Sequence, residues 1–112
     1  MIHRIMTTEQ LVELYAEAWR NLEADIIAPF LSQNFTYSSM WVFETLDKEN
    51  YINYLKGKFN AIRTSGGKPV VSTGSNETGI PSVILKQGGN PPVYITVKAS
   101  EGLISEAYMM AF

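Results

Sequence analysis

The spacing of apolar residues changes along this chain, and the change limits the folds that the chain can adopt. Between Leu11 and Ile62 most apolar residues recur at helical intervals, whereas from Pro69 onward they follow the alternation of β-strands. The change falls just after Ser65-Gly66-Gly67, a combination that favours the end of a helix. Helices followed by a run of strands predict an α+β domain, in which the helices pack on one antiparallel sheet.

The first half of the chain predicts three helices and one strand. Thr7 and Gln10 fit a capping box at the start of the first helix. Asp25 can cap a short second helix that ends by Leu31, because Pro29 within it limits its length. The apolar stripe of the first helix consists of Leu11, Tyr15, Ala18, Trp19 and Leu22.

One strand and a long helix complete the first half. The strand is predicted from Phe35 to about Glu44, and Asp47 then caps a helix that runs to about Thr64. Because strand side chains alternate, one face of the strand carries Phe35, Tyr37, Ser39, Trp41 and Phe43. Four further strands are predicted at Val70–Ser75, Ile80–Gln87, Val93–Ala99 and Leu103–Phe112, with a tight turn at Ser100-Glu101-Gly102.

Size and charge exclude several classes of protein. A chain of 112 residues favours one domain, 1–112, and the lack of cysteine excludes disulfides and thiolate zinc sites. The net charge is −2 and the nine Lys and Arg residues are scattered, so no nucleic-acid partner is expected. The N-terminus is too short and polar for a signal peptide, and no apolar run reaches the ~20 residues that span a bilayer. We therefore expect a cytoplasmic protein with no membrane partner.

The order of the elements resembles the nuclear transport factor 2-like superfamily, which includes SnoaL-like proteins and ketosteroid isomerases. The segments that carry the resemblance are Tyr15-Ala16-Glu17-Ala18-Trp19, Ala24-Asp25 and residues 29–37. The resemblance is to uncharacterised bacterial members in particular. It implies a curved sheet wrapped around helices, a cystatin-like α+β roll, with a cone-shaped pocket. It also implies a homodimer formed through the outer face of the sheet.

The residues argue against ketosteroid isomerase activity. That chemistry needs a carboxylate base and an oxyanion hole built from a tyrosine and a protonated carboxylic acid. The resemblance places the tyrosine at Tyr15 and the base at Ser39, but a serine hydroxyl is not a base near neutral pH. The second acid is missing too, since residues 93–99 contain no carboxylate. With His3 as the only histidine, we expect no catalytic residue, no metal and no cofactor.

Aromatic residues with polar tips predict a pocket for a small apolar or aromatic ligand, because small-molecule sites are usually built this way. Plain core packing is the alternative interpretation of the same aromatic residues. For Lys58 the alternative is a surface position with its head group in water. The candidate ligand-binding residues are Tyr15, Trp19, Tyr37, Ser39, Trp41, Lys58, Tyr108 and Met110.

Two functions follow from these patterns. The first is a SnoaL-like small-molecule-binding domain that is non-catalytic or weakly catalytic. The alternative is a dimeric protein–protein interaction domain without a functional pocket. Met40 and Val42 lie on the strand face opposite the aromatic residues, so both faces of the sheet carry apolar side chains. A partner covering the outer face would explain that distribution.

Overall fold

Both α-helices begin at a residue whose side chain caps the helix. The computed structural model describes residues 5–111. Within this range, it describes residues 42 and 43 by their backbone alone. Helix α1 (Thr8–Asn21) starts at the predicted capping box: the Thr7 hydroxyl accepts from the Gln10 N–H at 3.1 Å. Helix α2 (Lys48–Ser65) starts after Asp47, whose carboxylate accepts from the Asn50 N–H at 2.9 Å. Both predicted caps are confirmed.

The predicted second helix was wrong in form. The segment makes two 3-10 turns, η1 (Ala24–Ile26) and η2 (Ala28–Phe30), and neither has a side-chain capping bond, so Asp25 is not a cap. Pro29 lies inside η2 and has no N–H to donate, so an α-helix cannot propagate through this position.

The predicted strand 35–44 was also wrong, because it is a hairpin. Strand β1 (Leu31–Ser39) turns at Met40 and Trp41 into strand β2 (Val42–Asp47), which runs antiparallel to it. The pair Ser39 and Val42 closes the hairpin. The turn contains none of the Gly, Pro, Asn or Asp residues that mark most turns, so the sequence carried no signal for it.

The remaining four strands lie close to their predicted bounds. They are β3 (Val70–Ser75), β4 (Pro81–Lys86), β5 (Val93–Ser100) and β6 (Leu103–Ala111). The predicted tight turn joins β5 to β6 through Glu101 and Gly102, which both have positive φ, at 53° and 79°. Phe112 and His3 lie outside the described residues.

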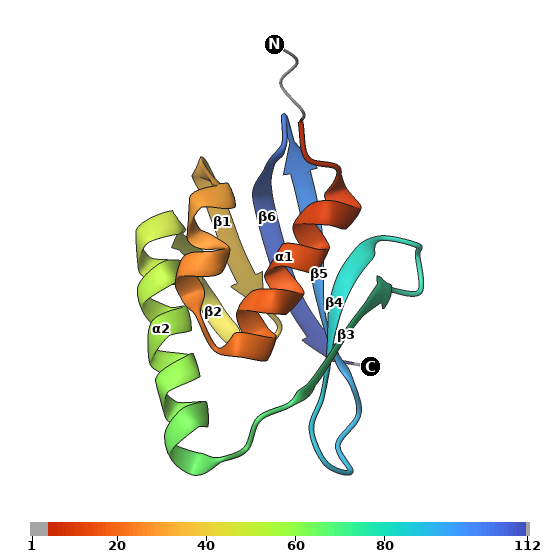
Figure 1. Ribbon diagram of the computed structural model, residues 1–112. Helices are drawn as coiled ribbons and strands as arrows, with labels where there is room; N and C mark the ends of the chain where they lie inside the picture. Colours follow the sequence, from red (N-terminus) through yellow and green to blue (C-terminus); the bar gives the residue numbers. More distant parts are fainter. Residues whose placement is uncertain (1–4, 112) are drawn as a thin grey trace.

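The six strands form one curved, open sheet in the order β2-β1-β6-β5-β4-β3 (Figure 1). The α+β fold is confirmed, but the sheet is mixed, because β1 and β6 run parallel while the other neighbours are antiparallel. No hairpin joins β1 to β6, so their direction is set by the whole of the chain between them. This departs from the purely antiparallel sheet that the sequence predicted.

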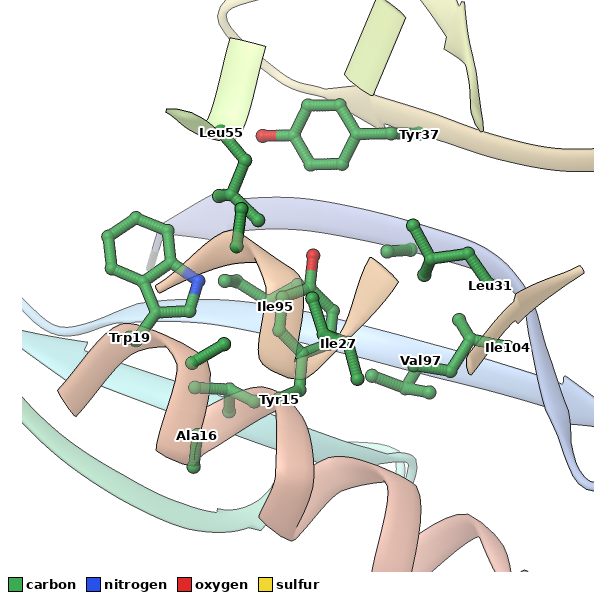
Figure 2. Close-up of a cluster of buried hydrophobic side chains, with 14 of the residues drawn as sticks. Tyr15, Ala16, Trp19, Ile27, Leu31, Tyr37, Leu55, Ile95, Val97 and Ile104 are labelled. Atoms are coloured by element: carbon green, nitrogen blue, oxygen red, sulfur yellow. The ribbon is translucent and has the colours of Figure 1, made fainter. Parts of the chain in front are cut away.

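Both helices cover the same face of the sheet, which we call the inner face. Helix α1 crosses β3, β4 and β5, and α2 lies along β1 and β2 (Figure 1). The core fills the space between them and includes Tyr15 from α1, Leu55 from α2, Tyr37 from β1, and Ile95 and Val97 from β5 (Figure 2). A cavity lies between α2 and the β4–β5 end of the sheet.

Candidate functional site

A cavity of about 390 Å³ opens between the C-terminal half of α2 and the β4–β5 end of the sheet. This volume lies within the ~300–1,000 Å³ range of small-molecule sites. Its walls are mainly apolar, and they come from both helices, from three strands and from the connection after α2. The apolar lining includes Trp19, Ala61, Ile62, Leu85, Val93 and Met109, and the polar lining consists of Lys58, Ser65, Gln87 and Asn90.

Hydrogen bonds from the β4–β5 loop fix the mouth of this cavity. The Gln87 side-chain amide donates to the Gly67 carbonyl and so ties the loop to the connection between α2 and β3. The Asn90 N–H donates to the Gln87 carbonyl at 3.1 Å, and Lys86 Nζ donates to the Asn90 carbonyl at 2.9 Å. These bonds join the β4–β5 loop to the connection after α2, and both segments line the cavity.

Trp19 joins the cavity to the core. Its side chain is 2% exposed, and its ring packs edge-to-face against Phe59 of α2 with centroids 4.9 Å apart. Its indole N–H has no hydrogen-bond partner among the described residues, although the nitrogen is fully buried. A buried donor without a partner costs about 1–3 kcal/mol, so the packing of the ring must outweigh that cost.

A stacked group of tyrosines, the tyrosine cluster (Tyr15, Tyr37 and Tyr51), lies deeper in the core. The hydroxyls of Tyr15 and Tyr51 form a hydrogen bond between α1 and α2. The rings of Tyr37 and Tyr51 stack with centroids 4.4 Å apart, which connects β1 to α2. The Tyr37 hydroxyl donates to Met109 Sδ at 3.7 Å, and Met109 lines the cavity. The cluster therefore contacts a cavity residue, Met109, but does not itself line the cavity.

Burial makes these tyrosines hydrogen-bonding groups and not bases. Desolvation raises the pKa of Tyr15, Tyr37 and Tyr51 above the ordinary tyrosine value, because the charged phenolate would lose its water. The hydrogen bond with Tyr51 lowers the pKa of Tyr15, but this effect is smaller than that of burial. For Tyr37 and Tyr51, neighbouring tyrosines add to the rise in pKa. The cluster stays neutral at physiological pH, so it can position neighbouring groups but cannot accept a proton there.

Solved structures with low sequence identity share the fold of this chain. A SnoaL-like protein of unknown function from Burkholderia thailandensis matches with a TM-score of 0.70 and 12% identity, over 96% of this chain and 99% of the other. A nuclear transport factor 2-like protein of unknown function from Cytophaga hutchinsonii matches at 0.68 and 17%, over 100% and 95%. This chain has the nuclear transport factor 2-like fold. No family model and no curated protein matches the sequence.

Other structures with the nuclear transport factor 2-like fold include one with a bound small molecule. It is a hypothetical protein with a ketosteroid isomerase-like fold from Catenulispora acidiphila, in complex with trimethylamine. It matches with a TM-score of 0.61 and 14% identity, over 92% of this chain and 85% of the other. At these identities the comparisons establish the fold alone.

Within the nuclear transport factor 2-like fold, five of the eight predicted site residues lie on the inner side of the molecule, in two groups. Trp19 and Lys58 line the cavity. Tyr15, Tyr37 and Ser39 are buried in the core and do not line it. The Ser39 hydroxyl accepts from the Trp41 N–H at 3.2 Å, which helps to hold the turn between β1 and β2.

The other three predicted site residues do not line this cavity. Trp41 lies in the β1–β2 turn and is 53% exposed, so it does not face the helices. Tyr108 and Met110 share one face of β6, and it is the outer face of the sheet, where they line a second hollow of about 330 Å³. The alternation along β6 turns Ala107 and Met109 toward the core, which leaves Tyr108 and Met110 outside.

Eleven of the thirteen described cavity residues were not predicted, among them Leu85, Gln87, Val93 and Met109. Leu85, Val93 and Met109 lie on predicted strands, but an alternating pattern does not show where along a strand a cavity begins. Gln87 follows β4 directly, and its position depends on the bond to Gly67, which is far away in sequence. No local signal could have identified that contact.

The outer face of this nuclear transport factor 2-like sheet carries an apolar stripe, formed by Ile84, Tyr94 and Met110. These three residues are neighbours in register across β4, β5 and β6. The stripe continues to Met40, which is 54% exposed and whose sulfur contacts the Ala111 N–H at 3.1 Å. Ile84, Tyr94 and Met110 are each partly exposed.

Between residues 5 and 111, no group of three or more His, Cys, Asp or Glu side chains could hold a metal ion. In the same range, no helix is long and apolar enough to cross a membrane.

Proposed function

We propose that this protein binds a small, mostly apolar molecule in the cavity between α2 and the β4–β5 end of the sheet. The observation that carries the proposal is the cavity itself: about 390 Å³, with apolar walls and a few polar groups at its mouth. The trimethylamine complex of the Catenulispora acidiphila protein supports it, since that protein has the same fold. The described lining contains neither a carboxylate nor a histidine, so we propose binding and not acid–base catalysis.

The test is to fill the cavity and measure what is lost. Ala61 lines the cavity, whereas Asn60, its neighbour on α2, is exposed and does not. The neutral fluorescent probe N-phenyl-1-naphthylamine is titrated against the wild-type chain, Ala61→Phe and Asn60→Phe. We expect Ala61→Phe to weaken binding by at least about tenfold, because its ring occupies the ligand's volume, and Asn60→Phe to change nothing. Equal binding by all three proteins, or no binding by any, would overturn the proposal.

A second function, homodimerisation through the outer face of the sheet, is favoured by the apolar stripe. Tyr94 and Met110 lie at its centre as register partners, so a charge placed there would be buried in a dimer. Sedimentation velocity compares the wild-type chain with Met110→Lys and with Asn53→Lys, an exposed position on α2. We expect a dimer that Met110→Lys alone dissociates. A wild-type monomer at high concentration would contradict this proposal and leave the first untouched.

A further inference from the structure

Charge is distributed unevenly along this chain. Residues 51–100 contain six Lys and Arg residues and a single acid, Glu77, although the whole chain has 11 acids and nine bases. This half of the sequence supplies nearly all of the cavity lining, apart from Trp19 and Met109. An acidic protein therefore forms its cavity from its basic half.

Three of these bases line the cavity or are neighbours of residues that line it. Lys58 lines it directly. Lys68 stands between the lining residues Gly67 and Pro69. Lys86 donates to the carbonyl of Asn90, which also lines the cavity.

Among the described residues, neither Lys58 nor its neighbours Lys68 and Lys86 have a carboxylate partner, whereas the other three bases of this segment each have one. Lys56 reaches Asp25 at 4.0 Å, Arg63 reaches Glu23 at 3.4 Å, and Lys98 reaches Glu106 at 3.6 Å. Those bases are neutralised by acids from other elements. Lys58 has no such acid, and the described cavity lining contains none.

The end of α2 opposes this positive charge only weakly. Its C-terminus at Ser65 carries a partial negative charge from the helix dipole, and that effect falls off within the last turn. Lys58 lies about two turns earlier. Of the described lining residues, Lys58 alone carries a charge.

We propose that the cavity selects a small apolar molecule that carries one anionic group, such as a carboxylate, and that Lys58 binds this group. The inference rests on the proposed binding function and specifies its ligand class. The apolar walls take the body of the molecule, while a charge-assisted hydrogen bond from Lys58 holds its anionic end at the mouth.

The test uses two probes with the same aromatic framework. 8-Anilinonaphthalene-1-sulfonate is anionic, and N-phenyl-1-naphthylamine is its neutral counterpart. Both are titrated by fluorescence against the wild-type chain, Lys58→Gln, Lys58→Glu and the matched control Lys56→Gln. We expect Lys58→Gln to weaken sulfonate binding about three- to tenfold and Lys58→Glu to weaken it further. Neutral-probe binding should not change, and Lys56→Gln should alter neither probe. Added salt should lower the affinity for the sulfonate alone.

The experiment distinguishes failure of the anion preference from failure of small-molecule binding in the cavity. If the neutral probe binds in the cavity, as judged by its loss in Ala61→Phe, and Lys58→Gln leaves sulfonate binding unchanged, the anion preference is overturned and the binding function stands. If neither probe responds to Ala61→Phe, the binding function itself fails. Circular dichroism of each variant tests whether the fold is retained. Because Lys58 is exposed, its substitution should leave the core intact.

Discussion

Replacing Tyr15 or Tyr51 with phenylalanine removes one half of a buried hydroxyl pair. Both side chains are essentially inaccessible, at 0% and 1% exposure, and their hydroxyls bond to each other across the two helices. When one hydroxyl is lost, the other stays buried without that partner. Each single variant should therefore lose about 1–3 kcal/mol of unfolding free energy.

The double variant should recover most of that loss. With both hydroxyls gone, no polar group remains to be satisfied, and replacing both partners by apolar groups of the same shape is nearly neutral. The two single losses would then sum to about 2–6 kcal/mol, against about 0–1 kcal/mol for the double variant. The coupling energy between Tyr15 and Tyr51 is the difference, and it should exceed about 1 kcal/mol.

Urea unfolding followed by circular dichroism measures all four proteins of this cycle. Tyr108→Phe is the control, because Tyr108 lies on the outer face and is 37% exposed. It should change stability by less than about 0.5 kcal/mol. Additive single effects would refute the reasoning, since they would mean that the two hydroxyls do not satisfy each other in the folded protein.

Three further predictions follow from burial and backbone geometry. Trp19→Ala should lower the free energy of unfolding in urea by about 3–5 kcal/mol, and Trp41→Ala by less than about 0.5 kcal/mol. Equal losses would contradict the buried position of Trp19 and the exposed position of Trp41. Burial raises the pKa of each tyrosine of the cluster in the folded state. The free energy of unfolding should therefore stay constant below about pH 9 and fall as the pH rises past 10. The fall should be at most about 1.4 kcal/mol per pH unit for each tyrosine. Absorbance at 295 nm should show those tyrosines ionising together with alkaline unfolding, and ionisation in the folded state would refute the assignment. Gly57→Ala should stabilise α2 by about 0.5–1 kcal/mol, because an added Cβ meets no atom within 4 Å; a loss in melting temperature would contradict it.

Local chemistry accounts for the parts of the fold that could be predicted from the sequence. Thr7 and Asp47 start their helices through hydrogen bonds that span three residues, and Gly66 ends α2 in the left-handed conformation that glycine favours. The β5–β6 turn is local in the same sense. Each of these signals lies within a few residues of the structure that it determines.

The parts that could not be predicted depend on contacts distant in sequence. Alternation showed that Tyr108 and Met110 share a face, but only the packing of helices on the sheet decides which face is inside. The hairpin turn at Met40 and Trp41 has no turn residues. For the site, the helical stripe placed Trp19, whereas Gln87 reaches the cavity mouth only through its bond to the α2–β3 connection.

The place of β6 in the sheet has a consequence for synthesis on the ribosome. Of the six strands, β6 is made last, yet it lies between β1 and β5 and is bonded to both. Until β6 emerges, the β1–β2 hairpin and the β3–β5 strands are two separate pieces, each with an exposed edge open to pairing with another chain. The nascent protein should therefore need protection from aggregation until its last strand leaves the exit tunnel, and should then close its sheet in a single late step.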